Sequence, residues 1–220
     1  MKTLLVNAMI GAAILTGATT ALKAGEERLS NAATVLNEMA AATDAGIPRS
    51  FIEKAKCLVV VPGVKKAAFG VGGQYGRGYI VCRTSTGWSA PGGIRIEGGS
   101  FGLQIGGTDT DVIMLVLNDR GVDRLLSSKF TVGADASVAA GPVGRQAAAQ
   151  TDATMMAEIL AWSRARGVFA GIALQGSTLR EDTSENRELY GGLVTNKAVV
   201  KGGHAAPKGS ADLMAALAKY

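Results

Sequence analysis

The segment of residues 108–145 constrains the fold of this chain more than any other. Its first part, residues 112–117, is a continuous apolar run, which predicts a strand buried on both faces. Residues 118–127 then predict a short helix with a polar cap, and residues 130–140 alternate as a second strand does before a Gly-Pro turn. Because this segment supplies no nucleophile, general base or set of metal ligands, it predicts a binding or scaffolding role.

Short runs separated by glycine fill the middle of the chain and predict a β-rich core. Residues 57–61 form an apolar strand that Pro62 and Gly63 are expected to end, and residues 69–107 contain several short strand-like runs between turn signals. Aromatic residues are only 5% of the chain, while 30 of its 220 residues are glycine. The prediction is an α+β protein with a β-rich antiparallel sandwich or barrel-like sheet and flanking N- and C-terminal helices.

Helical periodicity is found near both ends of the chain. Residues 26–42 place Leu29, Leu36 and Met39 on one face, which predicts an amphipathic helix that packs on the domain; insertion of this face into a membrane is the alternative. Residues 146–162 fit a helix or a strand, and their alternation favours the strand. Further short helices are predicted at residues 48–56, 184–190 and 211–218.

The N-terminus has the features of a secretory signal peptide. A lysine precedes an apolar span at residues 4–15, and small residues follow as far as Ala24, after which we expect cleavage. An uncleaved anchor is the alternative. The expected location is therefore periplasmic or exported, with peripheral association to the membrane. The predicted divisions are a signal peptide at 1–24, a domain at 25–192 and a C-terminal tail at 193–220 whose short helix belongs to the same domain.

The charge of the chain restricts its partners. Removing the predicted signal peptide lowers the formal net charge from +5 to +3, and a mildly basic protein is attracted to anionic head groups. No basic run is interleaved with the aromatic residues that stacking on nucleic acid would need, so no nucleic-acid partner is predicted. Cys57 and Cys82 lie in strand-like surroundings, where they form either a disulfide in an oxidising compartment or two buried thiols.

Few residues suggest catalysis. Residues 98–102 match the G-x-S-x-G pattern of serine hydrolases, with Ser100 as the nucleophile and His204 later in the chain. That pattern requires a helix directly after the serine, and the glycine-rich sequence that follows predicts a strand instead. One histidine excludes a His-rich metal site, and neither nucleotide-binding glycine motif is present. We therefore predict no enzyme activity, no metal and no cofactor.

Several motifs occur in a consistent order across residues 30–192, and together they resemble the SYLF family of lipid-binding domains. The motifs include Lys54-Ala-Lys56, Gly76-x-Gly78-Tyr79, Trp88-Ser-Ala-Pro91, the run from Asp111 to Asn118, Ser137 to Arg145, Trp162 to Gly176, and Asn186-x-x-x-Tyr190-Gly191. The resemblance implies a non-enzymatic domain that binds phospholipid, with an N-terminal amphipathic helix that helps it reach the bilayer. In eukaryotic members the lipids are phosphoinositides, and some fungal members also bind actin.

The leading hypothesis is a phospholipid-binding protein of the cell envelope, whose partner is an anionic membrane surface, with a phosphoinositide or another anionic lipid as ligand. A structural or protein-interaction module of the envelope, with an unidentified protein partner, is the first alternative. A serine esterase that uses Ser100 is the second. The predicted lipid contacts are Leu29, Leu36, Met39, Lys54, Lys56, Lys65, Lys66 and Arg77.

Overall fold

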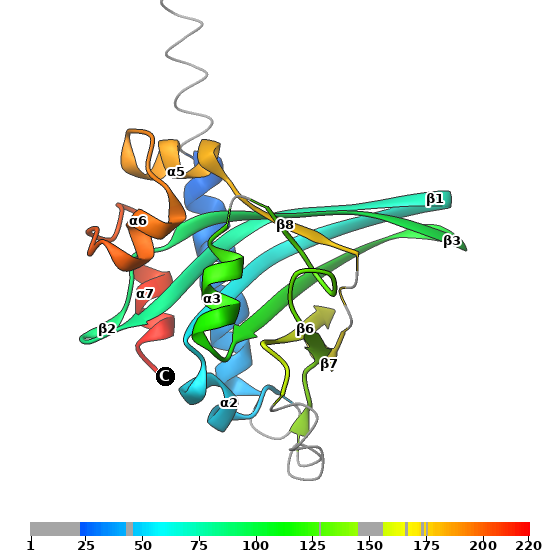
Figure 1. Cartoon of the computed structure of the whole chain (residues 1–220), viewed down its shortest axis with the longest axis horizontal. Coiled ribbons are helices and arrows are strands. Elements are labelled where there is room, and N and C mark those ends of the chain that lie inside the picture. Colours follow the sequence, from blue (N-terminus) through cyan, green and yellow to red (C-terminus); the bar gives the residue numbers. More distant parts are fainter. Residues whose placement is uncertain are drawn as a thin grey trace, which may run out of the picture.

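The computed structural model describes residues 23–42, 46–127, 129–144, 156–165, 167–172, 174 and 176–220, and for residues 68–71 and 100–106 the backbone alone. Figure 1 shows a long curved sheet with helices at one end and along one side. Most of the predicted signal peptide, residues 1–22, lies outside the described residues and stays a prediction. Of the stretch at 146–162 that fits a helix or a strand, residues 146–155 also lie outside the described residues, whereas its end from Ile159 is a strand, as predicted.

The strands are β1 (Cys57–Thr84), β2 (Gly87–Trp88), β3 (Gly92–Val116), β4 (Lys129–Thr131), β5 (Val138–Ala140), β6 (Ile159–Ala165), β7 (Val168–Gly171) and β8 (Thr178–Glu181). The helices are the N-terminal helix (residues 23–41), α2 (Arg49–Lys54), α3 (Asp119–Leu125), α5 (Thr183–Tyr190), α6 (Asn196–Lys201) and α7 (Ala211–Leu217). All the predicted helices are confirmed. Helix α6 was not expected, and the Thr195 hydroxyl caps it by accepting a hydrogen bond from the Ala198 backbone N–H at 3.2 Å.

Strands β1 and β3 form one long antiparallel hairpin, so the prediction of many short strands across residues 57–107 was wrong. Pro62 and Gly63 do not end the strand but form a bulge, where the register shifts between Val61 and Val64. The Gly63 backbone has a φ of 61°, and its N–H donates to the Asp111 carboxylate at 2.9 Å. Because the bulge takes up the residue that cannot pair, the strand continues beyond it.

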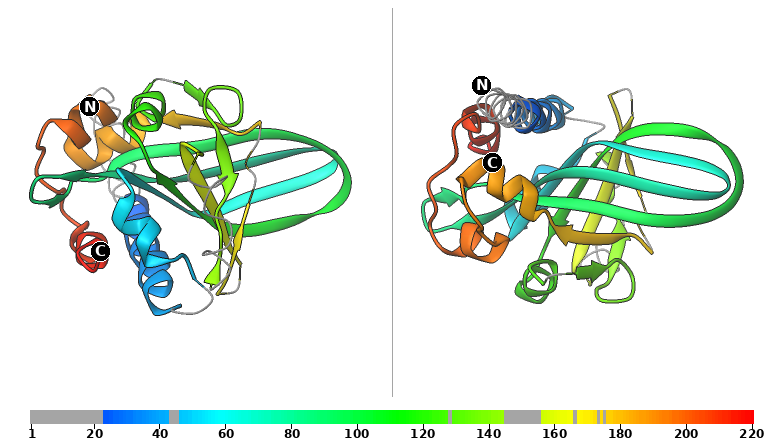
Figure 2. Two further views of the ribbon diagram at one scale, coloured as in Figure 1. Left: turned by 60° about the horizontal axis from the view of Figure 1, so that its bottom comes forward. Right: turned by 90° about the horizontal axis from the view of Figure 1, so that it is seen from above.

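The hairpin folds back on itself, as Figure 2 shows at the end where both strands turn together. The fold brings the start of β1 against its own end, and a disulfide joins Cys57 to Cys82 with 3.9 Å between their Cα atoms. A Cβ atom on Gly78 would lie 2.1 Å from the Val60 carbonyl oxygen. Glycine is therefore required where the two halves of the strand cross.

The remaining strands extend both halves of the folded hairpin into a curled sheet. Strand β8 pairs with the first part of β3, and β4 pairs with β8. Strand β6 pairs with the last part of β3, and it carries β7 antiparallel and β5 parallel to it. The predicted α+β class with a barrel-like sheet and flanking helices is confirmed, with one parallel strand pair in an otherwise antiparallel sheet.

Two apolar cores lie on opposite faces of the sheet. Alternate residues of the run at the start of β1 point to different cores, which explains why the run is continuously apolar. Cys57, Val59 and Val61 lie in the core inside the folded hairpin. Leu58 and Val60 lie in the core between the sheet and the N-terminal helix, α2 and α7.

The segment of residues 108–145, from which the sequence analysis started, contributes the residues that surround Trp162. Asn118 caps α3 as expected, since its side-chain oxygen accepts from the Gly121 N–H at 2.9 Å. Residues 130–140 are not one strand, because a turn between β4 and β5 interrupts them. A Cβ atom on Gly141 would lie 1.9 Å from the Trp162 ring, whose Nε1–H donates to the Pro142 carbonyl at 3.0 Å. The Gly-Pro turn thus allows the indole to be fully buried.

Candidate functional site

The apolar face of the N-terminal helix is part of the core. Leu29 and Leu36 are 0% exposed and Met39 is 3% exposed, and all three pack with residues of β1, β6 and α7. Because all three side chains are buried in the folded domain, they present no apolar surface to solvent there, and their role as lipid contacts stays a prediction. The prediction that the helix packs on the domain is confirmed.

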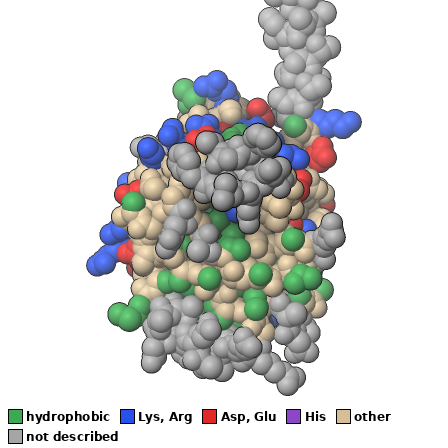
Figure 3. Space-filling view, turned by 90° about the vertical axis from the view of Figure 1, so that its right-hand side faces the viewer, with side chains coloured by type: hydrophobic (Ala, Val, Ile, Leu, Met, Phe, Trp, Pro, Cys, Tyr) green, Lys and Arg blue, Asp and Glu red, His purple; other side chains and the backbone are tan. Residues whose placement is uncertain are grey.

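The four predicted lysines lie at two separate places on β1 and its approach. Lys54 ends α2 and Lys56 precedes β1, with the Lys56 ammonium 3.8 Å from Asp119. Lys65 and Lys66 lie nine or more residues further along β1, about 30 Å at the usual rise of a strand. All four are exposed. Figure 3 shows Lys and Arg side chains along the upper part of one face, with hydrophobic side chains scattered below them.

Arg77, the fifth predicted basic contact, belongs to a buried ion-pair network instead. Its Nε donates to the Asp182 carboxylate at 2.6 Å, and its second nitrogen lies 3.3 Å from Glu185. Both acids have side chains that are 1% exposed. The Asp182 hydrogen bond raises the pKa of Arg77 above its ordinary value. Sequence reasoning did not detect these acids because they lie about 105 residues away in the chain.

The same network fixes the N-terminal helix to α5. Arg28 forms an ion pair with Glu185, and the Tyr79 hydroxyl donates to Glu185 as well. Burial, followed by the charge of Glu185, raises the pKa of Tyr79 above its usual range. Burial alone would raise the pKa of Asp182, but hydrogen bonds from Arg77, Ser184 and the backbone lower it to about 2. The network therefore holds Asp182 ionised and stabilises the fold.

Asn186 of the last motif and Asn196 of α6 also have a structural role. The Asn186 side chain accepts from the Gly93 N–H at 2.7 Å and donates to the Asn196 side chain at 2.8 Å. Asn196 in turn donates to the Gly93 carbonyl at 2.8 Å. Tyr190 donates to the Pro91 carbonyl at 2.7 Å. This motif thus anchors α5 and α6 to the first residues of β3.

Four basic residues lie side by side across the outer face of the sheet. The register places Arg77 of β1 opposite Arg95 of β3, Arg95 opposite Arg180 of β8, and Arg180 opposite Lys129 of β4. Directly opposed residues on neighbouring strands project from the same face, and the alternate residues Ile94, Ile96, Leu179 and Phe130 fill the inner core. We call Arg77, Arg95, Arg180 and Lys129 the cation row.

The cation row carries more positive charge than its neighbours neutralise. The Arg77 end lies beneath α5 and is paired, while Arg95 and Arg180 are 31% and 39% exposed and Lys129 is exposed. Among the described residues, Glu97 is the one acid within ion-pair distance of Arg95, at 2.8 Å, and of Arg180, at 3.5 Å. In both arginines the atom that faces Glu97 is the Nε, and this atom is buried. Like charges directly opposed on a sheet repel, so an anion bound here would relieve that repulsion.

Other places offer less to a ligand. A pocket of about 420 Å³ lies between the N-terminal helix and the β1 bulge, but its two arginines are already paired. Arg28 binds Glu185, and Arg164 binds Asp111 at 2.6 Å as well as Glu38. Ser100 lies within the uninterrupted strand β3, which lacks the strand-turn-helix geometry of a hydrolase nucleophile. Within the described ranges, no three residues are grouped as ligands for a metal ion.

Comparison with known proteins assigns the chain to a family. A family model described as Ysc84, Las17-binding protein actin regulator, matches residues 97–220. The chain belongs to the Ysc84, or SYLF, family. The Ysc84 match includes Arg180 and Lys129 of the cation row and both asparagines of the α5–α6 anchor, and the family named from the sequence motifs is confirmed.

Relatives in fungi and animals match about the same share of the chain. An SH3 domain-containing protein, PJ696.02, of Schizosaccharomyces pombe is 39% identical over 166 residues, 73% of this chain and 38% of its own length. LAS seventeen-binding protein 3 of Saccharomyces cerevisiae is 36% identical over 72% of this chain and 35% of its own. The human SH3 domain-containing YSC84-like protein 1 is 36% identical over 72% of this chain and 48% of its own. The Ysc84-family chain thus spans less than half the length of these relatives, whose names describe binding or SH3-containing proteins rather than enzymes.

Proposed function

We propose that this chain is a non-enzymatic module that binds anionic phospholipid at a membrane surface through the cation row. The observation that carries the proposal is the register that places Arg95, Arg180 and Lys129 side by side with one neighbouring acid. Arginine matches phosphate oxygens with paired N–H donors. Tyr75, which is 50% exposed and opposite Glu97, lies next to the row.

The strength expected of such a contact is moderate. A basic residue near an anionic bilayer contributes about 1 kcal/mol, and the attraction falls within a Debye length. The exposed lysines at residues 65 and 66 lie on the same long hairpin and add to the attraction. No helix in the described residues is long and apolar enough to cross a bilayer, so the proposed attachment is peripheral.

Vesicle flotation of the chain from Gly25 onward tests this proposal. We expect binding to vesicles with an anionic phospholipid, little binding to neutral vesicles, and loss of binding at high salt. Replacing Arg95 and Arg180 together by Gln should weaken binding by about 2 kcal/mol, or roughly 30-fold. The control replaces the exposed Lys197 and Lys208 by Gln, which removes the same charge from residues outside the row. Absence of flotation at low salt with both kinds of vesicle would refute lipid binding.

A protein-interaction module is the second candidate, because the matching family is described by binding to Las17 and one relative is named for the same property. The cation row would then meet an acidic segment of a protein. Crosslinking that recovers a protein partner, lost with the Arg95 and Arg180 replacements and combined with no vesicle binding, would favour this candidate over the lipid one.

We also propose that the chain is exported and cleaved after Ala24, which would place it at the outer side of a membrane. The disulfide between Cys57 and Cys82 supports this location, because such bonds persist in oxidising compartments. Intact mass measurement of the protein recovered from the expressing cell tests the cleavage. A mass that includes residues 1–24 would contradict it.

A further inference from the structure

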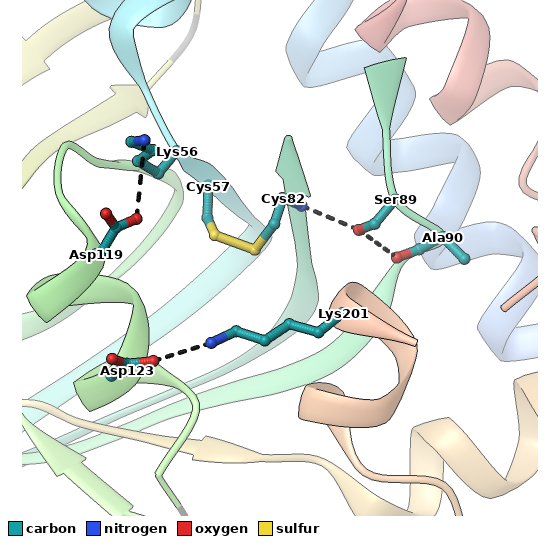
Figure 4. The surroundings of a disulfide bond; sticks show 8 residues. All are labelled: Lys56, Cys57, Cys82, Ser89, Ala90, Asp119, Asp123 and Lys201. Atoms are coloured by element: carbon teal, nitrogen blue, oxygen red, sulfur yellow. Dashed lines mark hydrogen bonds and ion pairs between the residues drawn. A yellow bond between two sulfur atoms is a disulfide. The ribbon is translucent and has the colours of Figure 1, made fainter. Parts of the chain in front are cut away.

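The disulfide lies at a pocket rather than in closed protein. Cys57 and Cys82 line a cavity of about 310 Å³ together with residues of α3 and α6. Figure 4 shows the two sulfurs between Lys56 on one side and Lys201 on the other. Cys57 is 0% exposed and Cys82 is 6% exposed. Val122 and Val200 form an apolar part of the cavity lining. The hydrocarbon part of a small molecule could therefore pack against them.

The cavity has more cations than carboxylates. Lys56, Arg83 and Lys201 line it, against Asp119 and Asp123. The Lys56–Asp119 contact is 3.8 Å and the Lys201–Asp123 contact is 3.0 Å, and all four side chains are about half exposed or more. Exposed pairs of this kind exchange readily with other ions.

Arg83 has a fixed position at the edge of the cavity. Its guanidinium carbon lies 4.0 Å from the centre of the Trp88 ring, and one nitrogen donates to the Tyr220 carbonyl at 3.0 Å. Within the described residues, no Asp or Glu side chain forms an ion pair with Arg83, whose neighbouring oxygen belongs to Tyr220, the last residue of the sequence. The disulfide is therefore set in a positive field, the environment that stabilises thiolates and attracts anions.

We propose that this pocket is a site of thiol–disulfide exchange with small anionic thiols. The thiolate sulfur of the incoming molecule attacks Sγ of Cys82, the more exposed of the two cysteines, and forms a new S–S bond. The Cys57–Cys82 bond breaks, and its electron pair stays on Cys57 as a thiolate beside the lysines. A second thiolate then attacks the mixed disulfide, so two external thiols are oxidised to a disulfide while the protein disulfide is reduced to two thiolates, which take up protons from water.

The exchange would open the disulfide that joins the start of β1 to its end. The Arg83 N–H donates to the Lys56 carbonyl at 2.8 Å, so one backbone hydrogen bond still joins the two ends of β1 after the disulfide opens. The mixed disulfide would place its added group between α3 and α6. This site is separate from the cation row, and the inference does not depend on lipid binding.

Three thiols of similar size test the inference: 3-mercaptopropionate is anionic, 2-mercaptoethanol is neutral and cysteamine is cationic. The full-length native chain is mixed with each, trapped with acid, and analysed by intact mass for the mixed disulfide. Rates are corrected for the thiolate fraction of each reagent. We expect the anionic thiol to react about three- to ten-fold faster than the neutral one, and the cationic thiol to be slowest. The order should disappear in 1 M salt or in denaturant.

Charge variants decide whether the pocket lysines cause the preference. Lys56→Gln and Lys201→Gln should each reduce the advantage of the anionic thiol about two- to three-fold, and the double variant should abolish it. The matched control is Lys65→Gln with Lys66→Gln, two exposed lysines about 30 Å further along β1, which should leave the advantage unchanged. Absence of a mixed disulfide in the native chain, equal corrected rates for the three thiols, or an equal effect of both variant pairs would each overturn the inference.

Discussion

At the scale of single residues, burial decides which charged groups support the fold and which are available to partners. Arg77 resembles a surface residue in the sequence, but its position beneath α5 makes it the counter-ion of two buried acids. Arg95 and Arg180, one and two strands away, are partly exposed and have one acid between them. Removing one partner of a buried pair leaves an uncompensated charge, whereas removing an exposed arginine does not.

Asp182 gives the fold an acid-sensitive component. Its folded pKa is about 2, below the ordinary 3.8, so it stabilises the protein above about pH 4 and loses that contribution as the pH falls towards 2. We expect Asp182→Asn to lower the free energy of unfolding at pH 6 by about 2 kcal/mol, and the difference from the parent to shrink at pH 2.5. Urea denaturation at both pH values measures this.

The control for the acid prediction is Asp109→Asn, since Asp109 is 60% exposed and forms a surface pair with Lys65. Such pairs contribute about 0–1 kcal/mol. A loss for Asp182→Asn that is the same at both pH values would show that the ionised carboxylate is not what stabilises the network.

At the scale of elements, the N-terminal helix is part of the hydrophobic core, because its apolar face is buried against the rest of the domain. Its three large apolar residues are covered by the sheet and α7, while the residues that face outward, including Ser30 and Asn37, are polar and exposed. The helix is also held by Arg28 through its pair with Glu185. Releasing it to a membrane would expose one whole core.

Leu36→Ala separates packing from membrane contact. We expect this change to lower the free energy of unfolding by about 3 kcal/mol, because it leaves a cavity in the core, and to leave anionic vesicle affinity unchanged. Ser30→Ala is the exposed control and should be near neutral in both measurements. If Leu36→Ala weakens vesicle binding more than it weakens folding, the helix contacts lipid after all.

At the scale of the whole molecule, the folded hairpin organises everything else. The two cores, the cation row and the disulfide pocket all arise where one half of the hairpin meets the other or meets an added strand. The disulfide closes a separation of 25 residues. Such a crosslink limits the freedom of the unfolded chain.

Replacing both cysteines by alanine should therefore lower the free energy of unfolding by about 3–4 kcal/mol. Guanidinium denaturation of the variant and of the parent, with and without a reducing agent, measures the difference. The reducing agent should destabilise the parent by a similar amount and leave the variant unaffected. A parent that is insensitive to full reduction would show that the crosslink adds nothing to stability.

Local features of this fold could be predicted from the sequence, and long-range ones could not. The features that were predicted correctly depend on residues only a few positions apart in the sequence. They are the cap at Asn118, the last helix and the apolar run at residues 112–117. The folded hairpin was missed because glycine at a strand crossing, such as Gly78, cannot be distinguished by composition from glycine in a turn. The cation row was missed because its residues lie far apart in the chain and meet only through strand register.

The backfolding of β1 onto its own start also limits how the family can change length. The disulfide between Cys57 and Cys82 fixes how the two halves of β1 lie against each other. An insertion within the paired part of β1 also changes its register with β3 unless β3 changes too. Insertions of an odd number would exchange the inner and outer faces beyond them. Length variation among homologues should therefore concentrate at the bend, where the register already shifts between Ala68 and Gly70, and should keep an even difference between the two strands.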